Sequence, residues 1–473
     1  MTDRTQPEES ARRIPLVALP RIALSVVWAS EPGRLGEVLL PPPRVDVVFG
    51  RGGPRPDDPA LRLSLVRQRP GLTTPTEPLE IQSMSRVQLA LRLDGALSVE
   101  RRGQLRLLHN GDDVERCVVV PGDVLMVGQQ LALLAVERPA TLPGTLEQGH
   151  PFGTVDAHGL VGESPATWAL RATIAFVAAR SGHVLVLGGS GTGKELVAQA
   201  LHAQSMRSGR PLVARNAATI PEGLVDAELF GNLRGYPNPG MPDRPGLVGR
   251  AHGSTLFLDE LAELSPAVQA HLLRVLDSGE YQRLGEAEMR RSDFRLVGAT
   301  NRPASSLKED VAARFLLRIE TPALDERRED VPLLVRHSFD EIAARDGNAA
   351  ARFVAPSGAP RIDGKWMSAL VRRSYATNVR ELHGLVWAAL ERSQGDTLGH
   401  GVEVDALVRP PSVRPVGEPA AIEGALTAEA VKRALDEHNG NIERTAKALG
   451  MANRYVLRRL IQKLDLEITR RPR

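Results

Sequence analysis

A glycine-rich turn between an apolar strand and a helical pattern is the strongest chemical signal in the chain. Residues 183–202 read HVLVLGGSGTGKELVAQALH. Glycines let successive backbone N–H groups turn inward around phosphates, and the helix N-terminus adds positive potential. Lys194, the first of six lysines in the chain, can reach the terminal phosphates of a nucleotide. The predicted nucleotide-binding residues are Gly188, Gly189, Ser190, Gly191, Thr192, Gly193, Lys194 and Glu195.

Two adjacent acids end a second apolar strand, STLFLDE, at Asp259 and Glu260. Asp259 is placed to hold the coordination shell of Mg²⁺, and Glu260 to polarise an attacking water. The alternatives are a ligand-free glycine turn and an acidic pair that caps a helix. The general phosphate-loop pattern has Ser or Thr where this chain has Glu195, but both halves of the site occur in order, each after an apolar strand. Together they predict an ATP and Mg²⁺ site.

The elements around these motifs predict a multidomain protein. Residues 15–138 hold short apolar or alternating runs separated by turns, which indicates a β-sandwich. In residues 159–395 strands such as VLVLG, TLFLDE and RLVGATN alternate with helical patterns, which indicates an α/β domain with a parallel sheet. Residues 139–158 and 396–422 are rich in Pro and Gly and are predicted linkers, and residues 423–473 are predicted to be all-α.

Residues 159–395 resemble the AAA+ domain of the sigma-54-dependent transcriptional activators, a P-loop ATPase with a helical lid. The motifs that carry the resemblance are GGSGTGKELVA, ELFG, LFLDE, LLRVLDSGEYQRLG, GATNR, ERREDVPLL and NVREL, in that order. In this family a glutamate after the phosphate-loop lysine is usual, which accounts for Glu195. The resemblance implies ATP hydrolysis coupled to activation of sigma-54 RNA polymerase holoenzyme.

The resemblance also implies roles for individual residues. Asn216 corresponds to a switch asparagine that holds the catalytic glutamate, Thr300 and Asn301 to sensor I, and Arg380 to the sensor II arginine. Arg314 corresponds to an arginine finger that reaches the ATP of a neighbouring subunit. Such fingers act in trans, so the resemblance implies a homo-oligomeric ring, a hexamer or heptamer.

Two positions depart from the family pattern. Lys308 stands where the family has its other finger arginine, and lysine keeps the charge but lacks the planar fork. After ELFG the family has a GAFTGA loop that touches sigma-54, whereas residues 235–240 here read GYPNPG. Tyr236 supplies a ring one position away, and two prolines stiffen the segment. A working variant loop and an eroded loop in a regulator that no longer remodels polymerase both remain open.

The N-terminal sandwich resembles a forkhead-associated (FHA) domain, a fold that binds phosphothreonine peptides. The resemblance rests on VVFGR, SRVQ, the Asn-Gly pair at 110–111 and PGDVLMVG. Arginine forks and hydroxyl donors on loops are what a phosphate needs, and Arg51, Ser85 and Arg86 fit those roles. A threonine-phosphorylated protein is therefore an expected partner.

The match to the FHA pattern is incomplete. Gln88 replaces the family histidine of SRxH, and residues 102–103 (Arg-Gly) compete with 110–111 for the place of the peptide-facing Asn-Gly. A sandwich that serves only as an assembly module is the alternative interpretation.

The C-terminal segment resembles the Fis-type helix-turn-helix that ends the same family. Three helical patterns follow residue 423, and the segment from Gly424 onward holds eleven basic and six acidic residues, a net charge of +5. A local basic excess indicates a polyanion partner, and DNA at an upstream, enhancer-like site is expected. The predicted DNA contacts are Arg454, Tyr455, Arg458 and Arg459.

Bulk properties narrow the class of protein. The 473 residues include one cysteine, Cys117, which fits a reducing cytoplasm. No run of about 18 apolar residues occurs, so a membrane span is not expected. The sequence thus predicts a cytoplasmic, DNA-bound ATPase that activates sigma-54 polymerase. The alternative is a DNA-bound regulator that binds ATP without opening promoters, and an AAA+ enzyme outside transcription is disfavoured by the helix-turn-helix.

Overall fold

The computed structural model describes residues 20–145, 149–402, 432 and 445. It divides the chain into two compact units, residues 1–411 and 412–473. The predicted three-helix DNA reader, with Arg454, Tyr455, Arg458 and Arg459, lies outside the described residues.

The N-terminal region is a sandwich of an eight-stranded and a five-stranded sheet. The larger sheet has the order β10-β9-β12-β13-β1-β2-β5-β6 and the smaller has β11-β8-β7-β3-β4. Apart from the parallel pair β3 and β4, neighbouring strands are antiparallel. This confirms the predicted β-rich region. The strands are β1 (Arg21–Ala29), β2 (Val38–Leu39), β3 (Asp46–Phe49), β4 (Leu61–Arg62), β5 (Val66–Arg69), β6 (Leu72–Pro75), β7 (Leu89–Asp94), β8 (Ala96–Arg101), β9 (Leu107–His109), β10 (Asp112–Asp113), β11 (Arg116–Val119), β12 (Val124–Val127) and β13 (Leu131–Arg138).

The central strands of the larger sheet are buried on both faces. Alternation along β1 sends Leu24 and Val26 into the core between the two sheets. Val27 of β1 and Leu134 of β13 enter a different core, which they share with the helices between residues 331 and 392. A strand buried on both sides carries a nearly continuous apolar run, as RIALSVVWA does.

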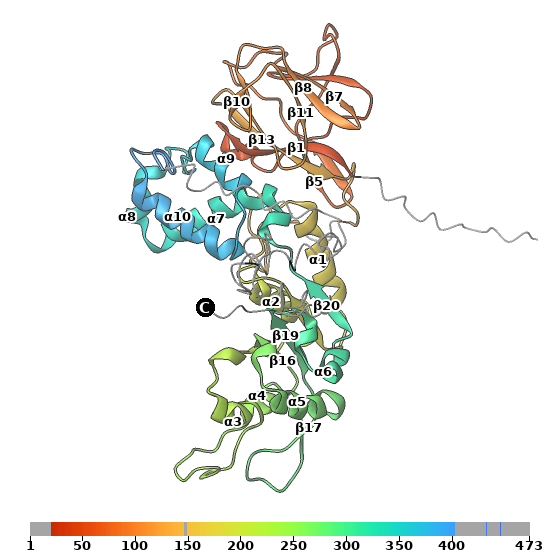
Figure 1. Ribbon diagram of the computed structural model, residues 1–473, viewed down its shortest axis with the longest axis vertical. Helices are drawn as coiled ribbons and strands as arrows, with labels where there is room; N and C mark the ends of the chain where they lie inside the picture. Colours follow the sequence, from red (N-terminus) through yellow and green to blue (C-terminus); the bar gives the residue numbers. More distant parts are fainter. Residues whose placement is uncertain (1–19, 146–148, 403–431, 433–444, 446–473) are drawn as a thin grey trace, which may run out of the picture. The chain divides into compact units, whose positions relative to one another are not determined.

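The central domain is built on a five-stranded parallel sheet of order β15-β16-β19-β14-β20. This confirms the predicted parallel sheet, and the neighbouring strands β16 and β19 lie side by side in Figure 1. Its strands are β14 (Val184–Leu187), β15 (Val213–Asn216), β16 (Thr255–Asp259), β19 (Arg295–Thr300) and β20 (Leu317–Glu320), and a separate ribbon pairs β17 (Glu280–Tyr281) with β18 (Arg290–Arg291).

Helices cover this sheet, and local sequence sets where several of them begin and end. Ser164 caps α1 and Ser265 caps α5, each followed by a proline at the first helical position. Gly279 ends α5 in the left-handed conformation at φ +73°. The helices of the sheet-bearing part are α1 (Pro165–Ala178), α2 (Lys194–Ala203), α3 (Val225–Phe230), α4 (Gly246–Arg250), α5 (Pro266–Ser278) and α6 (Glu309–Arg314).

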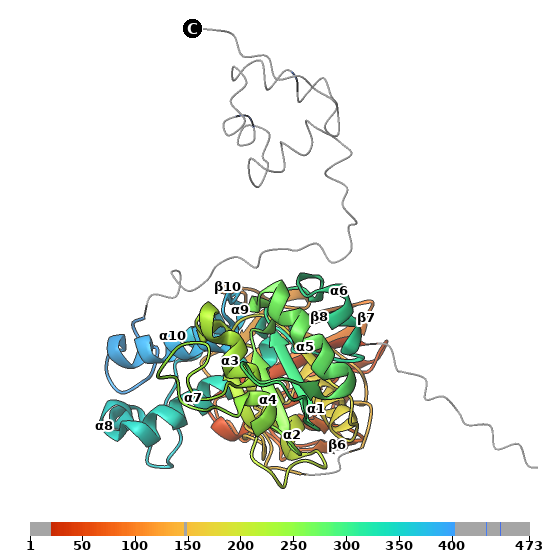
Figure 2. The same cartoon turned by 90° about the horizontal axis from the view of Figure 1, so that it is seen from below.

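Four further helices form the lid. Figures 1 and 2 both show α7, α8 and α10 gathered to one side of the parallel sheet. The lid helices are α7 (Val331–Arg345), α8 (Gly347–Ala350), α9 (Gly364–Arg372) and α10 (Asn378–Arg392). Among the described residues, no helix has the length and apolarity that crossing a membrane requires.

Candidate functional site

The glycine-rich turn joins β14 to α2, and its backbone needs glycine. Gly188, Gly191 and Gly193 have φ values of +154°, +74° and +99°, which are backbone conformations that residues with a Cβ rarely adopt. A Cβ on Gly188 would lie 1.9 Å from Oγ1 of Thr321, and one on Gly191 would lie 2.2 Å from the carbonyl oxygen of Thr377. The turn is therefore a close-packed backbone loop at the N-terminus of α2.

The Lys194 ammonium closes over this loop. Its Nζ donates to the carbonyl oxygens of Gly188 at 3.0 Å and Gly189 at 3.1 Å. Burial lowers the pKa of Lys194, and the nearby Glu260 and Asp259 carboxylates act in the opposite direction. The lysine is thus a buried cation whose present partners are weak carbonyl acceptors. An anionic phosphate would be a stronger partner.

The sheet register sets the acidic half of the site. Asn216 at the end of β15 pairs with Asp259 at the end of β16, and its Nδ2 lies 3.5 Å from the Asp259 Oδ2. Glu260 follows with φ +51°, and its Oε2 accepts from the Asn301 N–H at 3.3 Å. The structure therefore brings all four predicted residues together. Asn216 contacts the aspartate rather than the glutamate, and Asn301, after β19, holds the glutamate.

The lid adds residues from far along the chain. Nη1 of the predicted sensor Arg380 donates to Oγ of Ser190 at 2.8 Å. Asn378, 4% exposed, donates from Nδ2 to the Ser190 carbonyl at 2.9 Å and accepts the Leu324 N–H at 2.7 Å. Arg327 donates to the Thr192 carbonyl at 3.2 Å.

Sequence reasoning missed Asn378 and Arg327 as site residues. Both lie inside motifs that carried the family resemblance, NVREL and ERREDVPLL. Those motifs were the signal that could have found them.

The remaining predicted residues of the site lie nearer the surface. Arg314, at the end of α6, has a half-exposed side chain and forms an ion pair with Asp277 at 2.5 Å. Lys308 is the residue before α6, and its backbone N–H donates to Oε1 of Gln269 at 2.9 Å. Glu195 is exposed in the first turn of α2. In one chain, then, Arg314 lies against its own α5 and not against the glycine loop.

The residues of the site fit a magnesium nucleotide. The loop is a glycine turn at the N-terminus of α2, and Lys194 is held within it. Among the described residues, no cluster of three or more His, Cys, Asp or Glu side chains could hold a metal alone. Mg²⁺ is usually bound by one or two carboxylates together with phosphates and water. Asp259 would supply the protein ligand, and the nucleotide the others.

The loop that carries residues 235–240 is tied to the loop after β17. Asn232 bridges to both Arg244 and Leu284, so the loop of residues 231–245 shares its base with the loop of residues 281–290. A Cβ on Gly285 would lie 2.7 Å from Cγ of the Tyr236 ring. Tyr236 is 47% exposed, and its ring rests on the neighbouring loop.

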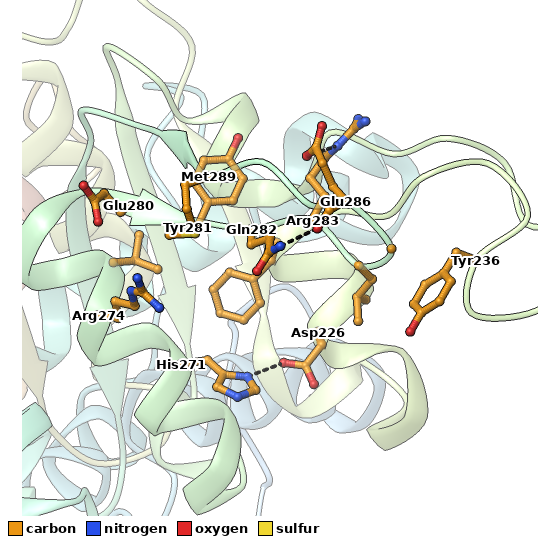
Figure 3. Close-up of a pocket in the computed structure, with 14 residues that line it drawn as sticks. Asp226, Tyr236, His271, Arg274, Glu280, Tyr281, Gln282, Arg283, Glu286 and Met289 are labelled. Carbon is orange, nitrogen blue, oxygen red and sulfur yellow. Dashed lines mark hydrogen bonds and ion pairs between the residues drawn. The ribbon is translucent and has the colours of Figure 1, made fainter.

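A pocket of about 540 Å³ lies between these loops and α5. Figure 3 shows Tyr236 on one side of the pocket and Tyr281 on the other. The Asp226 carboxylate accepts from His271 at 3.1 Å on its wall. Across the opening, ion pairs with Arg290 and Arg283 lower the pKa of Glu286 to about 2. The loop that carries Tyr236 therefore borders a mixed aromatic and charged surface.

A second pocket, of about 270 Å³, lies on the sandwich and contains Arg51, Arg55 and Arg86 together with Glu80. Nη2 of Arg86 donates to the Gly53 carbonyl at 3.2 Å. No hydrogen bond or ion pair of the Arg51 guanidinium occurs within the described part of the chain. This pocket therefore carries a net positive charge and an arginine fork without a carboxylate partner.

Of the two pairs that compete for the place of the peptide-facing Asn-Gly, residues 102–103 lie beside the SRVQ segment. The backbone N–H groups of Arg102 and Gly103 donate to the Gln88 carbonyl at 2.9 and 3.1 Å, and Oγ of Ser85 accepts the N–H of Gln104 at 3.0 Å. Gln88 is fully buried, and its Nε2 donates to the Leu105 carbonyl at 2.9 Å. Residues 102–103 thus adjoin the predicted phosphate residues.

The other pair, residues 110–111, serves a structural turn. The Asn110 side chain donates to Asp123 at 2.7 Å and accepts the Val124 N–H at 2.9 Å. Its carbonyl accepts from Arg372 of α9 in the lid at 3.1 Å. These contacts occupy Asn110 within the fold.

Comparison with known proteins places the chain among transcription regulators. Residues 160–322 match the sigma-54 interaction domain family. The transcriptional regulatory protein ZraR of Escherichia coli K12 is 35% identical over 336 residues, 68% of this chain and 74% of ZraR. The anaerobic nitric oxide reductase transcription regulator NorR of the same strain is 34% identical over 361 residues, 71% of this chain and 68% of NorR. NtrX from Brucella abortus, solved in complex with ADP, is 32% identical with a TM-score of 0.47, covering 66% of this chain and 70% of NtrX.

Proposed function

The chain belongs to the sigma-54-dependent transcriptional activators, and from this premise we propose that it hydrolyses ATP while bound to DNA and so activates sigma-54 RNA polymerase in response to a threonine-phosphorylated protein. The observation that supports the ATPase most directly is the meeting of Lys194 in the glycine loop with the Asp259 and Glu260 carboxylates. A buried cation facing two acids at a helix N-terminus is the arrangement that a magnesium triphosphate needs.

Each residue has a distinct part in the proposed reaction. The loop N–H groups and Lys194 hold the phosphates, and Arg380 approaches from the lid. Glu260 accepts the proton of the attacking water, and Asn301 orients its carboxylate through the backbone N–H bond. Asp259 would hold Mg²⁺, which neutralises charge that develops on the phosphates.

A ring would complete this site. The family resemblance assigns Arg314 to the nucleotide of a neighbouring subunit, and its half-exposed guanidinium is available for exchange from Asp277 to a phosphate. Arginine fingers supplied in trans contribute large rate factors because they stabilise charge in the transition state. A homo-oligomer is therefore part of the proposal, with Lys308 near the second finger position.

The input signal would be read at the arginine pocket of the sandwich. A phosphothreonine carries a charge of about −1.5 to −2 at neutral pH, more than the Asp58 carboxylate that lies 3.5 Å from Nη2 of Arg86. The phosphate would therefore displace Asp58 as the partner of Arg86 and also pair with Arg51, while Ser85 would donate its hydroxyl. Phosphopeptide binding is expected to be lost in Arg51→Ala and kept in Arg44→Ala, a control arginine whose side chain is 85% exposed and lies outside the pocket.

One experiment with the full chain tests the main function. ATPase activity and open-complex formation on a sigma-54 promoter are measured together, in the wild type and in Lys194→Ala, a variant expected to block ATP hydrolysis. The proposal expects both activities, and both should vanish in the variant. ATPase without promoter opening would contradict activation and leave the GYPNPG loop as the cause. An absence of nucleotide binding would contradict the ATPase itself.

The packing of Tyr236 favours a second candidate, an ATP-binding DNA regulator that does not remodel sigma-54. The ring rests on Gly285, and Arg283 pairs with Asp243 at 3.1 Å across the two loops. A loop fixed in this way would have to break these contacts before it could grip the polymerase. Promoter binding with ATPase but no open complex is the result that this candidate predicts.

A further inference from the structure

One arginine of the sandwich is buried among residues of the ATPase. Arg138, the last residue of β13, is 1% exposed. Its Nε and Nη2 donate to Oε2 of Glu329 at 2.9 and 2.8 Å, and Nη2 also donates to the Glu163 carbonyl at 2.9 Å. Nη1 donates to Oε1 of Gln68 at 3.0 Å. The guanidinium thus links a sandwich strand to two separate segments of the central domain.

Burying such an ion pair costs desolvation free energy. Burial raises the pKa of Glu329, against the Arg138 charge that lowers it, and a buried ion pair often adds no stability over apolar residues of the same size. What the pair does supply is a defined position, because Nε and Nη2 of Arg138 converge on one Glu329 oxygen while Gln68 and the Glu163 carbonyl hold the rest of the guanidinium. In this chain the group held in position is the segment that contains Glu329.

Glu329 lies in a short segment that reaches the nucleotide loop. The segment runs from Arg327 to Asp330 and leads into α7. On one side, Nη2 of Arg327, itself 5% exposed, donates to the Thr192 carbonyl in the glycine loop. On the other, Asp330 accepts the N–H groups of Glu163 and Ser164 at 2.8 and 2.9 Å, at the start of α1. A shift of Glu329 would therefore move groups that contact the phosphate loop.

The packing around the pair is continuous across the two regions. Val27 and Leu134 of the sandwich share one core with Leu334 and Trp366 of the lid. Nε1 of Trp28 donates to the Ile362 carbonyl at 2.7 Å. The sandwich therefore completes the core of the lid, and its sheet cannot move without disturbing the helices that contact the glycine loop.

We propose that Arg138 is a positioning residue of the ATP site, acting through Glu329 to hold Arg327 against the glycine loop. This inference rests on the proposed ATP binding. It makes the sandwich a structural part of the nucleotide site in addition to the place where the proposed input signal is read. A partner that strains the sandwich would change ATP affinity, and ATP would change the affinity for that partner by the same factor.

The test compares two buried arginines of the same interface. Arg69 bonds the Glu163 side chain at 2.5 Å and is 9% exposed, but it touches neither Glu329 nor Arg327. We compare full-length Arg138→Met, Arg138→Met with Glu329→Gln, and Arg69→Met with Glu163→Gln. The measurements are the Kd of a fluorescent magnesium-ATP analogue, KM and kcat for ATP, and thermal unfolding. The double variant matters because Arg138→Met alone leaves the buried Glu329 carboxylate unpaired, which can prevent folding. Arg69→Met would leave the buried Glu163 carboxylate unpaired in the same way, so this control is made together with Glu163→Gln.

The expected result is a Kd and KM for ATP raised about fivefold or more, the lower end of ordinary coupling between sites, in the folded double variant. The kcat should change less than KM, and Arg69→Met with Glu163→Gln should bind nucleotide as the wild type does. Wild-type affinity in Arg138→Met with Glu329→Gln would overturn the proposal, as would an equal loss in the Arg69→Met control. If the wild type itself took up no nucleotide, the proposed ATP function would fail instead.

Discussion

Replacing Asn378 tests how the lid holds the glycine loop. Its side chain makes two buried bonds, to the Ser190 carbonyl and from the Leu324 N–H. A neutral hydrogen bond contributes about 1 kcal/mol net, and a buried N–H left without a partner costs about 1–3 kcal/mol. Asn378→Gly should therefore weaken the contact between lid and loop by about 2–4 kcal/mol.

Asn378→Ala should be the more damaging change. The residue has φ +51°, and a left-handed conformation costs a residue with a Cβ about 1 kcal/mol or more relative to glycine. Part of the loss is absorbed, because the Val379 N–H still donates to the Gly191 carbonyl at 3.1 Å. We expect the Kd for magnesium-ATP to rise at least about tenfold in Asn378→Gly, since 1.4 kcal/mol is tenfold in affinity. In Asn378→Ala the Kd should rise about fivefold further, the equivalent of about 1 kcal/mol.

The assay is a titration of the full chain with a fluorescent ATP analogue and magnesium, together with thermal unfolding of each variant. Thr377→Ala is the matched control, because Thr377 directly precedes α10 and its side chain makes no capping hydrogen bond. The reasoning would be refuted if Asn378→Gly bound nucleotide as tightly as the wild type. It would also be refuted if Thr377→Ala lost as much affinity as the two Asn378 variants.

Three further results are expected. Glu260→Gln should bind ATP normally but turn it over at least about 100-fold more slowly, as for loss of a general base; wild-type turnover would reassign the water-activating acid. Gly285→Ala should displace the Tyr236 ring and change promoter opening, whereas Gly240→Ala, with φ +89° and open space around it, should not; equal effects would mean that backbone strain alone is responsible. Burial by itself would raise the pKa of Glu381, but hydrogen bonds from Arg373 and two backbone N–H groups outweigh burial and lower the pKa. The stability that these bonds provide is therefore present above the ordinary glutamate pKa and is lost as the pH falls through the lower pKa of the folded state. The stability difference between wild type and Glu381→Gln, followed by thermal unfolding, should therefore shrink with acid, and a constant difference would contradict this assignment.

Elements with a local signal could be predicted from the sequence. The apolar strand, the glycine turn and Lys194 lie within a short window, and Asp259 and Glu260 end a second apolar strand. Strand patterns of β1, β3, β7, β9, β12, β14, β16 and β19 were likewise readable, because burial on one or two faces leaves a short-range pattern. The motif order was sufficient to indicate the family.

Weaker elements were not readable in this way. Strands β15, VARN, and β20, LRIE, are short and carry charged residues, so no apolar pattern marks them. They form the two edges of the parallel sheet, where a strand has a neighbouring strand on one side only. Their place was decided by the sheet that they complete.

Contacts between residues far apart in the chain could not be predicted from the sequence and are known from the folded structure. Asn378 contacts a loop 188 positions earlier, and Arg138 pairs with Glu329 across 191 positions. Tyr236, seen in sequence as a displaced aromatic residue, rests on Gly285 of another loop. Local spacing carries no information about such partners, because each contact depends on how sheets and helices pack after the chain closes over long distances. The residues are in the sequence, but their pairing is a property of the folded core.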